Sequence, residues 1–211
     1  MNPENFKAAY ISKEEIEKVA SEIRNKYLST HRIPVEVLSF AEFDLNLEFE
    51  FAHIQHLGYD AFLRPDLTGI WFDREVFKNQ SFQRRLRFTT AHELAHLFLH
   101  KGIYEKLTFL SVEKWIKFIG DVPLLQYQRI EWQADEFAGR FLMPTKELSR
   151  ALDQTMEDLE REGFLTEEEE RVLELCCQSM HSDFGVSFPA MQTRLRKSTL
   201  WPHPKLSKAS K

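Results

Sequence analysis

The sequence predicts an α+β fold in which a mainly helical bundle packs on a small antiparallel sheet. Three observations support this prediction. Apolar residues recur at helical spacing over several long segments, while residues 45–72 show the alternation and the turn composition that are typical of strands. The 211 residues are 43% hydrophobic and include 18 phenylalanines, which is enough to form one packed core.

Helical periodicity is the strongest local pattern in the chain. The expected helices cover residues 11–28, 37–43, 81–100, 127–141, 147–160, 166–180 and 187–195. Three of them begin with residues that cap helices. Ser12 with Glu15 and Thr166 with Glu169 fit the capping box, and Ser187 precedes the last helix.

The sheet is expected to lie just before the 81–100 helix. Residues 45–51 alternate between apolar and polar side chains, which predicts a strand with one buried face. Residues 59–63 and 69–72 flank the turn-forming stretch 64–68, which predicts a hairpin. We therefore expect these strands to pair in antiparallel fashion.

Residues 92–96, His-Glu-Leu-Ala-His, place two imidazoles and a carboxylate at the spacing of a helix-borne zinc site. At about 100° and 1.5 Å per residue, His92 and His96 lie one turn apart on one helix face and can converge on one metal ion. Glu93 can then reach a water on that metal and act as a general base. The alternative is a pair of core histidines that hydrogen-bond backbone carbonyls.

A catalytic zinc site needs a third protein ligand, and the 127–141 helix offers two carboxylates four residues apart. We assign Glu131 as the ligand because its side chain reaches further. Asp135 is then expected to accept a hydrogen bond from a ligating imidazole and to fix its tautomer. An ordinary solvated pair of carboxylates is the alternative.

His100 continues the four-residue series, but a straight helix places it about 12 Å along the axis from His92. We expect His100 to be a helix-end residue near the negative end of the dipole, with substrate contact as the lesser alternative. The substrate oxyanion needs a further hydrogen-bond donor, and His100, Tyr104 and Tyr127 are the candidates. Residues 103–126 are expected to form a short extra helix that covers the core or, less favoured, overhangs the cleft.

Three segments together are similar to the ImmA/IrrE-type metallopeptidases. These segments are Arg87-Phe88-Thr89-Thr90-Ala91-His92-Glu93-Leu94-Ala95-His96-Leu97-Phe98-Leu99-His100, Glu131-Trp132-Gln133-Ala134-Asp135-Glu136-Phe137-Ala138 and Phe141-Leu142-Met143-Pro144. Residues 187–195 also resemble the closing helix of that family. The resemblance implies a minimal thermolysin-like (gluzincin) core with an HExxH motif, and it places Glu131 as the third ligand.

The resemblance also implies a substrate. Members of this bacterial or phage-associated family typically cut a helix-turn-helix transcriptional repressor, and so release genes for DNA-damage response or mobile-element transfer. Two features differ from the family pattern. Asp135 stands where asparagine is usual, and the segment between the two helices that carry the ligands is longer than usual. No helix-turn-helix segment precedes the peptidase motif, so the repressor is expected to be a separate chain.

Charge and cysteine content narrow the setting. A net charge of −5 and a pI near 5.9 argue against a protein that mainly binds nucleic acid. No apolar run is long enough to span a bilayer, and the N-terminal residues lack the layout of a secretory signal. Cys176 and Cys177 are adjacent, which suits helix packing better than a disulfide. A cytoplasmic protein without membrane partners is expected.

The expected organisation is one metallopeptidase domain over residues 11–197, since no repeat or clear linker interrupts the chain. Its catalytic core should cover about residues 30–145 and its C-terminal helical part about 146–197. Residues 1–10 are polar and expected to be loose. Residues 198–211 contain several lysines and are expected to form a disordered, solvated tail rather than a nucleic-acid contact.

The sequence thus leads to two hypotheses of different class. The first is a metallo-endopeptidase with one Zn²⁺, or Mn²⁺ or another divalent ion, bound by His92, His96 and Glu131. The second is a non-catalytic zinc-containing regulatory module that binds a repressor or toxin, and the intact Glu93 argues against it. A single-chain DNA-binding repressor is a weaker third hypothesis, given the acidic balance.

Overall fold

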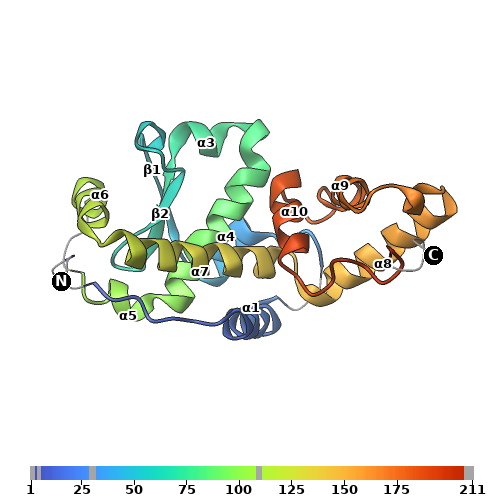
Figure 1. Ribbon diagram of the computed structural model, residues 1–211. Helices are drawn as coiled ribbons and strands as arrows, with labels where there is room; N and C mark the ends of the chain where they lie inside the picture. Colours follow the sequence, from blue (N-terminus) through green and yellow to red (C-terminus); the bar gives the residue numbers. More distant parts are fainter. Residues whose placement is uncertain (1–2, 4–5, 29–31, 108–110, 207–211) are drawn as a thin grey trace. The chain divides into compact units, whose positions relative to one another are not determined.

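The computed structural model describes residues 3, 6–28, 32–107 and 111–206 and divides the chain into two compact units (Figure 1). The first unit comprises Met1–Ser29 with Glu36–Phe141, and the second comprises Thr30–Val35 with Leu142–Lys211. A small sheet and helices that carry the predicted metal ligands all lie in the first unit, whereas the described elements of the second unit are helical. The α+β class is therefore confirmed.

The three-stranded sheet consists of β1 (Glu48–Ala52), β2 (Ala61–Leu63) and β3 (Gly69–Asp73) in the order β1-β3-β2. β2 and β3 pair in antiparallel fashion, as the hairpin prediction requires. β1 pairs with β3 in parallel, so the expectation of an all-antiparallel sheet was wrong. Alternation along a strand reports which face is buried but carries no information on the direction of the neighbouring strand.

The connection after β1 explains this topology. A 3₁₀ turn over Gln55–Leu57 ends at Gly58, whose φ of 88° is in the left-handed region that glycine tolerates. The chain then enters the far edge of the sheet as β2, and the hairpin returns it through the centre as β3. β3 is buried at every position because it has neighbours on both sides.

Helices cover the rest of the first unit. They are α1 (Lys13–Tyr27), α2 (Val37–Ser39) with a π-helical turn (Phe40–Asp44), α3 (Arg74–Lys78), α4 (Gln83–Leu99), α5 (Lys101–Tyr104), α6 (Val112–Asp121) and α7 (Leu124–Leu142). The capping box of α1 is present, since Glu15 N donates to Ser12 Oγ at 3.2 Å and Ser12 N donates to Glu15 Oε2 at 2.8 Å. α4 packs against β2, which brings the predicted zinc motif next to the sheet edge.

The second unit contains α8 (Thr145–Arg161), α9 (Glu169–Met180) and α10 (Phe188–Arg196). Ser187 caps α10, as expected. The second predicted capping box was wrong: Thr166 ends a 3₁₀ turn, and its hydroxyl donates to the Gly163 carbonyl instead of accepting from α9. Cys176 and Cys177 are both buried thiols on α9, in agreement with a packing role.

Parts of the expected tail and N-terminal segment are described. Residues 198–206 contact the helices of the second unit, for example through His203 Nε2 at 3.0 Å from Asp153 Oδ1. Residues 207–211, together with residues 1–2, 4–5, 29–31 and 108–110, lie outside the described residues. Among the described helices, none combines the length and the apolar character needed to cross a bilayer.

Candidate metal centre

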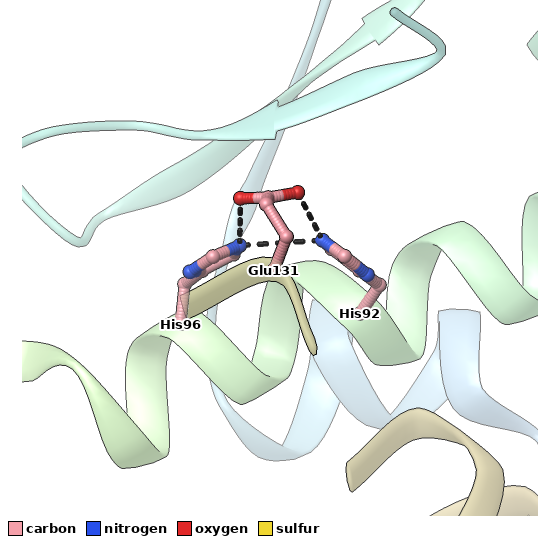
Figure 2. A group of neighbouring side chains, drawn as sticks. All are labelled: His92, His96 and Glu131. Carbon is pink, nitrogen blue, oxygen red and sulfur yellow. Dashed lines mark hydrogen bonds and ion pairs between the residues drawn. The ribbon is translucent and has the colours of Figure 1, made fainter. Parts of the chain in front are cut away.

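The predicted motif lies on α4, and its two imidazoles point toward a carboxylate of α7 (Figure 2). The Nε2 atoms of His92 and His96 are 3.3 Å apart. Glu131 Oε2 is 3.2 Å from His92 Nε2, and Glu131 Oε1 is 3.6 Å from His96 Nε2. The three side chains converge because His92 and His96 lie one turn apart on a helical segment without glycine or proline, and because α7 faces that side of α4.

These separations test whether a metal ion fits the three side chains. Two ligand atoms that are each 2.0–2.1 Å from a tetrahedral ion lie about 3.4 Å apart. The observed separations of 3.2, 3.3 and 3.6 Å scatter around that value. His92, His96 and Glu131 also form a group whose ligand atoms all lie within 4.8 Å of one another. Two imidazoles and one carboxylate are a known donor set of catalytic zinc sites, so the residues fit a zinc ion.

Asp135 lies on the side of His92 that faces away from Glu131 and contacts its Nδ1 atom. Its Oδ1 is 2.9 Å from His92 Nδ1, so His92 donates from Nδ1 and directs Nε2 toward Glu131. Burial lowers the pKa of His92, but hydrogen bonds to Asp135 and Glu131 outweigh burial and raise that pKa to about 10. The position therefore favours a positive charge, which a bound divalent cation would supply in place of the proton.

Its surroundings favour the neutral form of His96. Burial, together with the neighbouring His100 and His92, lowers its pKa well below 6.5. A neutral imidazole is the form that binds metal ions.

Glu93 lies beside the three candidate ligands and is 6% exposed. Its Oε2 accepts a hydrogen bond from the backbone N–H of Leu63 in β2 at 2.6 Å. Burial raises the pKa of Glu93 to about 7, against the opposing effect of His92. A carboxylate with a pKa near 7 suits general acid–base chemistry at neutral pH.

A cavity of about 230 Å³ opens beside these residues, entirely within the first unit. His92, Glu93, His96 and Glu131 form part of its wall. Much of the remaining wall is apolar and includes Phe6, Phe62, Phe88, Trp115, Phe118 and Ile119. Trp115 and Phe118 are buried on α6, so this helix lines the cavity, and the favoured expectation that it merely covers core was incomplete.

The three candidates for oxyanion contact have different positions. Tyr104 and Tyr127 line the cavity, and burial raises the pKa of both phenols, which therefore remain hydrogen-bond donors at neutral pH. His100 is the C-cap of α4, which confirms its helix-end position. It is 4% exposed and is not among the described residues that line the cavity, so the structure does not support contact between His100 and substrate.

Two contacts of the site were not predicted from the sequence. The Leu63 backbone holds Glu93, and Gln133 Oε1 lies 2.8 Å from His100 Nε2. Gln133 could have been noticed, because a polar residue there interrupts the apolar stripe formed by Ile130 and Phe137 at helical spacing. The backbone contact of Leu63 leaves no sequence pattern.

Comparison with known families agrees with this geometry. The model of the peptidase M78 family, described as the IrrE N-terminal-like domain, matches residues 77–196. The chain belongs to this family. The match includes α4 and α7 and therefore all three candidate ligands, and membership of a metallopeptidase-type family implies a metal ion. No curated protein and no solved structure matches the chain significantly.

Proposed function

We propose that this M78-family protein is a zinc-dependent endopeptidase, with His92, His96 and Glu131 as ligands and Glu93 as general base. The observation that carries the proposal is the convergence of two Nε2 atoms and one carboxylate within 4.8 Å, next to a buried carboxylate with a raised pKa. A site that only binds a partner has no need of Glu93 at this position.

When bound, zinc would polarise the scissile carbonyl and lower the pKa of a water toward about 7. Glu93 would take a proton from the attacking water as the water oxygen bonds to the scissile carbonyl carbon, and it would pass that proton to the amine as the C–N bond breaks. The hydrogen bond from Leu63 N–H holds one carboxylate oxygen of Glu93 toward β2. Tyr104 and Tyr127 both line the cavity, which supports either phenol as the hydrogen-bond donor to the oxyanion.

The edge of β2 that faces away from β3 offers backbone groups of Ala61 to a peptide substrate. Asp73 N–H donates to Asp60 O, and Arg64 N–H donates to Gly69 O. In residues 60–64, the backbone N–H and C=O groups of the even-numbered residues therefore point toward β3. The backbone groups of Ala61 therefore point to the opposite edge, and Ala61 lines the cavity. An extended substrate segment could add to this edge as a further strand, with its scissile bond beside Glu93.

The proposed substrate is a separate helix-turn-helix transcriptional repressor, cleaved in the cytoplasm during a stress or mobile-element response. This finer assignment rests on the resemblance of the motif segments to the ImmA/IrrE-type peptidases and on the acidic charge of the chain. Manganese or another divalent ion could serve as the physiological metal, because the ligand set does not determine availability.

Substitution of Glu93 by glutamine tests the activity. Glu93→Gln is expected to retain one bound zinc and to lose cleavage of the repressor encoded nearest to this protein, as measured by elemental analysis and mass spectrometry of the products. Glu22→Gln is a matched control, because Glu22 is an exposed α1 residue in a surface ion pair. Cleavage by Glu93→Gln at the parent rate would refute the role of Glu93. A stable complex with uncut repressor in the parent would instead support the regulatory module.

A further inference from the structure

A row of hydrogen bonds leads from His96 away from the cavity to the N-terminal segment. His96 Nδ1 is 2.9 Å from His100 Nδ1, and His100 Nε2 is 2.8 Å from Gln133 Oε1. Gln133 Nε2 donates to the carbonyl oxygen of Ala9 at 2.9 Å. The side chains of His100 and Gln133 thus join a candidate metal ligand to the backbone of Ala9.

The last acceptor fixes the direction of the whole row. A backbone carbonyl only accepts, so the amide nitrogen of Gln133 faces Ala9 and its oxygen faces His100. His100 must then donate from Nε2, which leaves Nδ1 of the neutral ring as an acceptor. His96 consequently donates from Nδ1 and presents the lone pair of Nε2 to the ligand cluster.

We propose that His100 and Gln133 are positioning residues that hold His96 in the Nδ1–H tautomer, with the Ala9 carbonyl as the anchor of the row. The proposal rests on the proposed metal site. The Nδ1–H tautomer of His96 matters there because it leaves Nε2 free to bind a cation. His92 achieves the same result by another means, because its Nδ1 donates directly to the carboxylate of Asp135.

Burial makes the row the main determinant of this tautomer. His96 and His100 are each 4% exposed, and Gln133 is fully buried. Bulk water therefore has little access to satisfy a nitrogen that loses its partner, and a buried polar group without a partner is unfavourable.

The N-terminal strap (residues 6–10) holds the anchor in place. Ala8 N–H donates to Gln126 Oε1 at 2.8 Å, and Arg129 donates to the Ala8 carbonyl at 3.0 Å. The ring of Tyr10 stacks on Trp132, with centroids 6.4 Å apart. α7 thus holds the strap through several side chains on either side of Ala9, and the strap becomes part of the support of the metal site.

The test compares His100→Asn with His100→Leu in the full chain. These side chains have similar shape, and both lose the contact with Gln133, but only asparagine offers an acceptor near the position of His100 Nδ1. Loss of the acceptor in His100→Leu is expected to weaken zinc affinity about 10- to 100-fold. His100→Asn is expected to bind zinc at least about tenfold more tightly than His100→Leu, as measured by competition with a chelator. Equal affinities of the two folded variants would overturn the proposal.

A second measurement does not depend on the variants or on peptidase activity. Long-range ¹H–¹⁵N NMR of the metal-free parent reports which ring nitrogen of His96 carries the proton. Nδ1 protonation supports the proposal, and Nε2 protonation overturns it. Loss of cleavage in Glu93→Gln tests the proposed activity separately, so the two proposals can fail independently.

Discussion

Asp73 at the end of β3 holds two parts of the first unit together through backbone groups. Its Oδ1 accepts from the N–H groups of Glu75 and Val76 and so caps α3. Its Oδ2 accepts from the N–H groups of Ile54 and Gln55, each at 2.9 Å. The residue is only 2% exposed, so water cannot readily replace it. Asp73→Ala therefore removes the partner of four backbone donors at once.

The expected cost follows from these contacts. Loss of a helix N-cap costs about 1 kcal/mol, and a buried donor left without an acceptor costs about 1–3 kcal/mol. Together we expect Asp73→Ala to lower the free energy of unfolding by roughly 2–4 kcal/mol, a large part of the 5–15 kcal/mol that is typical of a domain. Urea denaturation at pH 7 measures the difference, and the exposed Asp44→Ala is the control, expected within about 0.5 kcal/mol of the parent.

The same carboxylate makes the effect dependent on pH. Burial favours the protonated form of Asp73, but four backbone hydrogen bonds outweigh it and lower the pKa of the carboxyl. A group with a lowered folded-state pKa stabilises the fold above its unfolded value of about 3.9, and this contribution is lost as the pH falls through the folded value. The difference between parent and Asp73→Ala should therefore shrink below about pH 4. A cost below about 1 kcal/mol at pH 7, or a difference that grows in acid, would refute the reasoning.

Two further substitutions test other parts of the structure. Asp135→Ala should weaken zinc affinity about 10- to 100-fold because His92 Nδ1 loses its acceptor, and unchanged affinity in a chelator competition would show that Asp135 does not orient His92. Gly69→Ala would place a Cβ 2.4 Å from the Glu48 carbonyl oxygen and should cost about 1–3 kcal/mol by thermal denaturation, whereas nothing lies within 4 Å of a Cβ at Gly120, which serves as the control. Equal stability of the two glycine variants would contradict the parallel pairing of β1 with β3.

The features that the sequence predicted correctly depend on local geometry. The one-turn spacing of His92 and His96 and the four-residue spacing of Glu131 and Asp135 are set by the helix itself. Local spacing does not determine whether the two helices face each other. In the structure the two helices do face each other, which brings the ligand atoms of His92, His96 and Glu131 within 4.8 Å of one another.

The features that the sequence did not predict depend on long-range packing. The parallel pairing of β1 follows from the path of the chain between Ala52 and Ala61 and not from the residues of β1 itself. The contacts of Glu93 with Leu63 and of Gln133 with Ala9 join segments that are 30 and 124 residues apart. Thr166 fits a capping pattern in the sequence, but its hydroxyl donates to the Gly163 carbonyl in the preceding turn instead.

The apolar lining of the cavity also depends on long-range packing that the sequence pattern does not determine. Trp115 and Phe118 have the helical spacing of ordinary core residues, and both are buried as such residues are. Their position in the wall of the cavity depends on where α6 lies relative to α4 and α7, which the spacing alone does not determine.

The central claim is that His92, His96 and Glu131 together bind one divalent cation. The most direct measurement is zinc binding by the parent and by Glu131→Gln, both purified without chelators, combined with X-ray absorption of the loaded parent. We predict one zinc per parent chain, with nitrogen and oxygen ligands at about 2.0–2.1 Å, and markedly weaker binding by Glu131→Gln. A parent chain that contains no metal and takes up none on soaking, or a Glu131→Gln variant that binds zinc as tightly as the parent, would contradict the claim.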